Sequence, residues 1–70
     1  MDAKLIGQRL RELREKKELT QGDVAKLFRI SLGSVSAHEL GNRMPSDDLK
    51  IRYAKFYKCT VEEIFYKGMY

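Results

Sequence analysis

The sequence predicts a small all-α domain built from five short helices. Apolar residues recur at helical spacing, and a serine or threonine suited to cap a helix precedes four of the five segments. No segment alternates apolar and polar residues as a strand would. Because the chain has only 70 residues, we expect a single domain over residues 1–70, with a core over about 5–65 and a tail over 66–70.

The first predicted helix runs from about Ala3 to Lys17. Ile6, Leu10 and Leu13 are spaced three or four residues apart and therefore share one face, while charged side chains fill the remaining surface. This pattern predicts an amphipathic helix whose apolar face packs on a core.

The second predicted helix covers Gln21 to Phe28. Thr20 precedes it and Asp23 follows three residues later, so these two side chains can satisfy free amides at the helix start. The residues that we expect to point inward are Val24, Leu27 and Phe28.

The third and fourth helices are marked by their ends. Ser31 can cap a helix over about 32–40, and Gly41 can adopt the left-handed conformation that ends it. After a loop over 42–45, Ser46 can cap the fourth helix. That helix carries Leu49, Tyr53 and Tyr57 at four-residue intervals.

A fifth short helix is predicted after Thr60, because Thr60 and Glu63 have the spacing of a capping box. The residues expected to be buried by it are Val61, Ile64 and Phe65.

Charge and cysteine content narrow the classes of function. Fourteen Lys and Arg against ten Asp and Glu give a net charge of +4, which favours an anionic partner, nucleic acid first. Cys59 is the one cysteine and there is one histidine, so we expect no disulfide, no metal and no cofactor, and Cys59 itself to be a buried inert thiol. No apolar run approaches the roughly 20 residues of a membrane span, and we expect a cytoplasmic protein.

The second and third helices are joined by a tight turn, and the third is short with small residues, as in a helix-turn-helix unit. Over about residues 5–65 the sequence resembles the lambda-repressor-like, Cro-type (XRE) DNA-binding family. The residues that carry the resemblance are Leu19, Thr20, Gln21, Val24, Ala25, Leu27, Ile30, Ser31, Ser34, Val35, Ser36, Glu39, Gly41, Pro45, Ser46, Ala54 and the run from Cys59 to Phe65.

The resemblance implies roles for particular residues. It implies a structural ion pair between Arg14 and Glu39, and phosphate contacts from Gln21 and from the loop after the third helix. Gln21 would sit at the positively polarised start of a helix, which suits a phosphate contact; the alternative is a helix-start residue without that role. The phosphate contacts that we predict come from Gln21, Arg29, Ser31, Asn42 and Arg43, with a merely solvated Arg43 as the alternative.

The base-reading face of the third helix is predicted from helical geometry. Val35 points inward, so the opposite face is a row of small or smooth groups that also includes Leu40. No Arg, Gln or Asn lies on this face, so base readout would rest on thymine methyl groups and on serine hydroxyls. The base-reading residues that we predict are Leu32, Gly33, Ser34, Ser36 and Ala37.

The sequence departs from the family pattern in three places. Arg29 replaces the usual turn glycine, so it either adopts the left-handed conformation at a cost or the turn differs. Lys50 replaces a core leucine, and we expect Leu49 to take its place by a one-residue adjustment. His38 replaces a large apolar residue and is expected to be a partly buried packing group without a catalytic role.

One recognition helix reads only a few base pairs, so proteins of this plan usually dimerise on a near-palindromic site. The dimer contact that we predict consists of Ile64, Phe65, Tyr66, Met69 and Tyr70; the alternative is that these groups fold back over the core. The function predicted is a dimeric repressor that binds double-stranded operator DNA, associates with the nucleoid and is not an enzyme. The alternative is an antirepressor or antitoxin-like module that binds a protein through the third helix.

Overall fold

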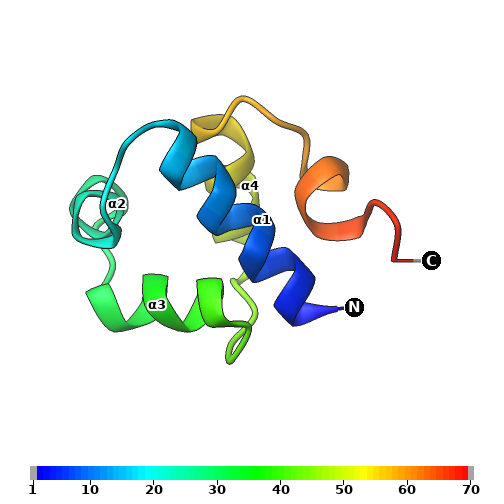
Figure 1. Cartoon of the computed structure of the whole chain (residues 1–70), viewed down its shortest axis with the longest axis horizontal. Helices are drawn as coiled ribbons and strands as arrows, with labels where there is room; N and C mark the ends of the chain where they lie inside the picture. The colour runs from blue at the N-terminus through cyan, green and yellow to red at the C-terminus, as the bar shows by residue number, and fades with distance from the viewer. Residues whose placement is uncertain (1, 70) are drawn as a thin grey trace.

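The computed structural model describes residues 2–69 of the chain, and these form four α-helices and one π-helical turn (Figure 1). The elements are α1 (Ala3–Lys16), α2 (Gln21–Phe28), α3 (Leu32–Leu40), α4 (Asp47–Phe56) and the turn η1 (Glu62–Tyr66). The prediction of an all-α domain with five helical segments is therefore confirmed. In Figure 1, α3 forms one edge of the molecule, α1 crosses above it, α2 and η1 lie at opposite ends, and α4 lies behind α1. Within residues 2–69, no helix has the length and apolar character needed to cross a membrane.

Helix boundaries match the caps that the sequence predicts. Thr20 and Asp23 form a capping box, because each side chain accepts a hydrogen bond from the other residue's backbone N–H at 3.0 and 2.9 Å. Ser31 and Ser46 accept in the same way at the starts of α3 and α4. Gly41 ends α3 with φ +78°, the left-handed conformation that glycine adopts at little cost.

Arg29 takes the left-handed conformation itself, with φ 55° and ψ 44°. The amide of Ile30 then donates to the carbonyl of Ala25 at 3.1 Å, which closes the end of α2. The turn between α2 and α3 thus keeps this geometry without a glycine, at a cost of about 1–2 kcal/mol for a residue with a Cβ atom.

The core lies between all five elements. The prediction that Leu27 of α2 belongs to this core is wrong. Leu27 is 57% exposed, whereas Ala25 is buried. The eight-residue helix has its inward face along Val24, Ala25 and Phe28, so Leu27 points away from the core. The buried apolar residues are Ile6, Leu10, Val24, Ala25, Phe28, Val35, Tyr53, Ala54, Tyr57, Ile64 and Phe65.

Helices α1 and α3 touch backbone to backbone at Gly7. A Cβ atom at Gly7 would lie 2.2 Å from the carbonyl oxygen of Glu39, and one at Gly41 would lie 2.9 Å from the Cα atom of Lys4. Only glycine fits at these two positions, because any side chain would separate the helices. The contact fixes the position of α3 relative to the rest of the fold.

The fifth element begins where the sequence predicts, but it is a π-helical turn rather than an α-helix. Thr60 and Glu63 form the expected capping box. The amide of Lys67 donates to the carbonyl of Glu62 at 2.8 Å, five residues back. From α1, the guanidinium of Arg9 donates to the carbonyls of Glu63, Ile64 and Lys67, which ties the turn to the first helix.

Two residues of the predicted dimer contact belong to the core instead. Ile64 is 2% exposed and Phe65 is 0% exposed, so neither can touch a second chain while the fold is intact, and their assignment as dimer contacts is wrong. They fold back over the small core, which was the alternative. Tyr66 and Met69 are half-buried, and Tyr70 lies outside the described residues.

Lys50 is buried, and Leu49 does not take its place. Only 8% of Lys50 is exposed, and its Nζ lies 5.8 Å from the centre of the Phe65 ring and 5.6 Å from that of Tyr66. The ammonium group reaches Asp47 Oδ1 at 3.6 Å. The expected one-residue adjustment is wrong because the lysine stem packs among apolar groups while its charge remains close to aromatic faces and a carboxylate.

Candidate nucleic-acid interface

The outer face of α3 is exposed at both ends and partly accessible between them. Leu32 and Leu40, at its two ends, are 55% and 60% exposed. Between them Gly33 is exposed, and Ser36 and Ala37 are half-buried. This face carries no charge, and it lies along one edge of the molecule (Figure 1). Such a smooth, narrow helix can approach the floor of a DNA major groove closely.

The inner face of α3 is anchored by Val35 and His38. Val35 is fully buried, and His38 is 3% exposed. His38 Nδ1 lies 3.0 Å from the Tyr53 hydroxyl, and the two rings meet edge to face. Burial, and secondarily the positive charge of Arg43, lowers the pKa of His38. His38 is therefore a neutral packing group that links α3 to α4.

A buried ion pair joins α1 to α3. Arg14 donates from Nε to Glu39 Oε2 at 2.8 Å and from Nη2 to Glu39 Oε1 at 3.0 Å, and the two side chains are only 12% and 5% exposed. Arg14 also donates to the carbonyl of Leu19 at 2.8 Å. The hydrogen bonds to Glu39 raise the pKa of Arg14. The structure thus brings together the two residues that the resemblance pairs.

Gln21 belongs to the same network. Its Nε2 donates to Glu39 Oε1 at 3.0 Å from the first residue of α2. A side-chain amide has two N–H groups, so one remains for another acceptor. Gln21 is half-buried, and its amide is held by Glu39 before any ligand binds.

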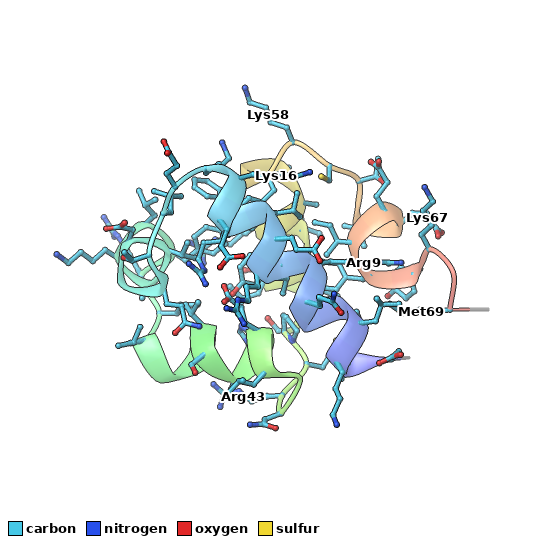
Figure 2. The ribbon with its side chains drawn as sticks, in the orientation of Figure 1. Arg9, Lys16, Arg43, Lys58, Lys67 and Met69 are labelled. Atoms are coloured by element: carbon cyan, nitrogen blue, oxygen red, sulfur yellow. The ribbon has the colours of Figure 1, made fainter. Side chains whose placement is uncertain are left out.

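Arg43 lies beside the first turn of α3, although it follows the helix in sequence. Its Nη2 donates to Ser34 Oγ at 2.6 Å, and Ser31 and Ser34 join their hydroxyls at 2.9 Å. Figure 2 shows Arg43 on the outer side of α3. The structure therefore connects a predicted base-reading residue with two predicted phosphate-binding residues.

The sequence does not predict this hydrogen bond, because Ser34 and Arg43 are nine residues apart and are predicted to have different roles. The sequence feature that indicates the hydrogen bond between Arg43 and Ser34 is Gly41, the glycine that ends α3. After Gly41 the chain turns back, and the amides of Asn42 and Arg43 both donate to the carbonyl of Ala37. A reversal of this kind directs the next side chain along the helix that it follows.

Two further predicted site residues lie apart from this cluster. Arg29 is exposed in the turn before α3, and Asn42 is exposed in the loop after it. The expectation that Cys59 is buried is wrong: it is half-buried and lines a cavity of about 330 Å³ between α1 and η1. Its Sγ donates to the carbonyl of Tyr57 at 3.4 Å. No three His, Cys, Asp or Glu side chains within residues 2–69 gather as metal ligands would.

Comparison with known protein families identifies the family to which most of the chain belongs. A family model described as "Helix-turn-helix domain" matches residues 5–64, which is most of the chain. A search of curated proteins and a search of solved structures each gave no match. The matched range includes α2, the left-handed turn at Arg29 and α3.

Proposed function

Because the chain belongs to the helix-turn-helix domain family, we propose that it is a sequence-specific transcriptional regulator that binds double-stranded DNA through α3. The observation that supports this proposal best is the open, uncharged outer face of α3 with donors at its border. Arg43 lies on one side of that face, and the amide of Gln21 lies at the start of the neighbouring α2. This arrangement suits a helix that enters a groove between two phosphate backbones.

In this mechanism the outer face of α3 reads the bases. Leu32 and Ala37 supply apolar contacts for thymine methyl groups, and Ser36 supplies a hydroxyl that donates or accepts. Gly33 and Ser34 complete the reading face and allow close approach. Direct readout therefore favours sites rich in A·T pairs.

Phosphate contacts hold the helix in position. Gln21 offers its free amide N–H, and Arg43 offers the guanidinium donors that Ser34 does not use. Asn42 and Arg29 add donors at the two ends of α3, and the Ser31 hydroxyl contacts a phosphate by exchanging its present acceptor, Ser34 Oγ. These contacts carry no base information, but they set register and orientation.

We further propose that the chain acts as a dimeric repressor on a near-palindromic operator, with recognition helices about 34 Å apart. With Ile64 and Phe65 in the core, the residues left for the dimer contact are Tyr66, Met69 and Tyr70. Occupation of the operator would block polymerase without any ligand. A cytoplasmic, nucleoid-associated location follows from this role.

The test is selection from a random-sequence duplex library at physiological salt with the purified chain. Enrichment of a two-fold symmetric motif supports a dimeric operator-binding protein. Enrichment of an asymmetric motif supports DNA binding by a monomer, and no enrichment contradicts the proposal.

Two variants of equal charge change sharpen this test. Ala37→Glu places a carboxylate on the reading face, whereas Lys58→Gln removes a positive charge at the opposite end of the molecule from Arg43 (Figure 2). Both lower the net charge by one. We expect Ala37→Glu to abolish enrichment and Lys58→Gln to preserve the motif, because only the first introduces repulsion inside the groove.

Loss of a base contact and loss of a phosphate contact have different effects on DNA affinity and on the preferred sequence. Gln21→Ala should weaken binding to all sequences alike, whereas Ala37→Gln should change the preferred base more than the overall affinity. A base-specific effect of Gln21→Ala, or an unchanged motif with Ala37→Gln, contradicts these roles.

The exposed Leu32 and Leu40 also support a second candidate function, in which α3 binds a protein as an antirepressor or antitoxin-like module does. Salt dependence separates the two functions. DNA affinity falls steeply with salt because counterions are released, whereas apolar docking changes little.

A further inference from the structure

We propose that the groove between α2 and α4 is a docking site for an acidic amphipathic segment of a partner protein. The groove has a volume of about 400 Å³ and is lined by Leu27, Phe28, Arg52, Lys55 and Phe56. None of these residues is among the proposed DNA contacts, although α2 carries Gln21 at its other end and Arg29 follows Phe28, so the groove is a different set of side chains.

The floor of the groove is apolar. Leu27 is 57% exposed, and beside it the rings of Phe28 and Phe56 meet edge to face with centres 5.3 Å apart. Phe28 is buried and Phe56 is half-buried, so the two rings form a surface anchored in the core. An aliphatic or aromatic side chain placed here would cover Leu27 and remove apolar area from water on both partners.

The rim of the groove is cationic. Arg52 donates from Nη2 to the carbonyl of Phe28 at 2.7 Å, and its guanidinium lies 5.0 Å from the centre of the Phe28 ring. Lys55 lines the groove from the next turn of α4, and Lys17 Nζ lies 5.3 Å from the centre of the Phe56 ring. The guanidinium of Arg52 is thus held by Phe28 before a ligand arrives, and it retains unused donors for a carboxylate.

A comparison with the cavity between α1 and η1 shows why the charge of the groove matters. That cavity is also lined by three basic residues, but Glu12 and Glu63 line it as well. No carboxylate lines the groove between α2 and α4, within the residues that the structure describes. The positive charges of Arg52 and Lys55 are therefore not balanced by a carboxylate within the groove itself.

An acidic amphipathic segment fits this surface better than DNA or a second copy of the chain. A phosphate backbone would neutralise Arg52 and Lys55 but would leave Leu27 and Phe56 uncovered. A two-fold contact between two copies would bring like-charged rims together. A helix with one apolar face flanked by carboxylates satisfies both the floor and the rim.

The experiment starts with a displayed library of random 12-residue peptides, selected on the purified full chain without DNA. We expect enrichment of peptides that combine two or more carboxylates with large apolar residues at helical spacing. The affinity of an enriched peptide is then measured by fluorescence anisotropy. We expect Lys55→Gln and Leu27→Ser each to weaken it by about tenfold, since both remove a groove contact.

The matched control is Lys58→Gln, which lowers the net charge as Lys55→Gln does but lies outside the groove. Leu27 and Lys55 are exposed, so these variants keep the core intact. Equal losses with Lys55→Gln and Lys58→Gln, or enriched peptides without carboxylates, would overturn the proposal.

Two other results would assign the groove to a different occupant. If sedimentation shows a dimer that Leu27→Ser dissociates, the groove is a self-association surface. If Lys55→Gln weakens duplex binding while Lys58→Gln does not, the groove belongs to the DNA footprint. Failure of the duplex selection, by contrast, would count against the proposed function and leave this site untouched.

Discussion

The two sides of α3 are built in opposite ways. On the inner side, Val35 is fully buried, His38 meets the Tyr53 hydroxyl, and Glu39 receives three hydrogen bonds. On the outer side, Leu32 and Leu40 lie in solvent.

This difference shows that the helix is held from one side only. Its sequence contains Gly33, Ser34 and Ser36, which are weaker helix formers than alanine, so its own tendency to be helical is modest. Stability comes from the inner contacts, and the outer residues remain free to be chosen for what they bind. The predictions below separate the two sides, from the largest expected effect to the smallest.

Removal of the buried carboxylate should cause the largest loss on the inner side. Glu39→Ala leaves the guanidinium of Arg14 buried without its partner, and we expect the free energy of unfolding to fall by about 3–5 kcal/mol. Urea denaturation near 15 °C measures this. Glu15→Ala is the control, since Glu15 pairs with Arg11 at the surface and should matter little. Equal losses from the two variants would show that the buried network is not what holds α3.

A methyl group at the contact between α1 and α3 should be the next most damaging change. Gly7→Ala puts a Cβ atom 2.2 Å from the Glu39 carbonyl oxygen, and we expect a loss of about 1–3 kcal/mol as the helices separate. Gly22→Ala is the control, because the nearest atom that its Cβ would meet beyond the neighbouring backbone is Thr20 Oγ1, at 3.7 Å. Thermal denaturation should show Gly22→Ala to be more stable than the original chain and Gly7→Ala to be less stable.

A glycine-to-alanine substitution on the outer side of α3, Gly33→Ala, should stabilise the fold and weaken DNA binding. A Cβ atom at Gly33 would meet only Ser31 Oγ at 3.9 Å, so Gly33→Ala should raise the free energy of unfolding by about 1 kcal/mol through helix propensity. The added methyl group would keep α3 further from the bases. Calorimetry should therefore show a higher stability, while the affinity for duplex DNA falls. If stability and affinity rose or fell together, the separation of the two sides would be contradicted.

A smaller effect concerns pH. Because burial lowers the pKa of His38 below its ordinary value of 6.5, the unfolded chain takes up a proton at a pH where the folded chain does not. The stability contributed by neutral His38 is therefore complete above about pH 6.5 and is lost as the pH falls toward the lowered pKa.

His38→Asn keeps a hydrogen-bonding group near Tyr53 but does not titrate in this range. We expect the free energy of unfolding of the variant to be flat between pH 7 and 5.5, where that of the original chain declines. The lowered pKa values of the capping carboxylates Asp23 and Glu63 act at lower pH, so they do not obscure the comparison. A decline of equal size in the variant would show that His38 is not responsible.

Local signals made most of the fold predictable from the sequence. The bounds of α2, α3 and α4 follow from Thr20, Ser31, Gly41 and Ser46, because a cap acts on amides within its own turn. The approach of Gly7 to Glu39 could not be predicted in this way, since it joins residues 32 positions apart.

The errors concern residues whose environment is set by distant parts of the chain. Apolar side chains near a chain end suggest either an interface or a core, and only the packing of α1 on η1 assigns Ile64 and Phe65 to the core. The burial of Lys50 could not be predicted, because its aromatic neighbours, Phe65 and Tyr66, come from another element. In the candidate site, residue types were predictable, but the bond between Ser34 and Arg43 required the path of the loop.

The three hydrogen bonds of Arg9 have a consequence for the order in which the contacts of the fold form during synthesis. Arg9 lies in the first helix, yet its acceptors are carbonyls of residues 54 to 58 positions later. Because a ribosome synthesises the chain from its N-terminus, α1 is made long before the carbonyls that Arg9 contacts, although its partner α3 follows sooner. The first helix therefore packs on α3 first, and its attachment to η1 is completed only when Lys67 has been added.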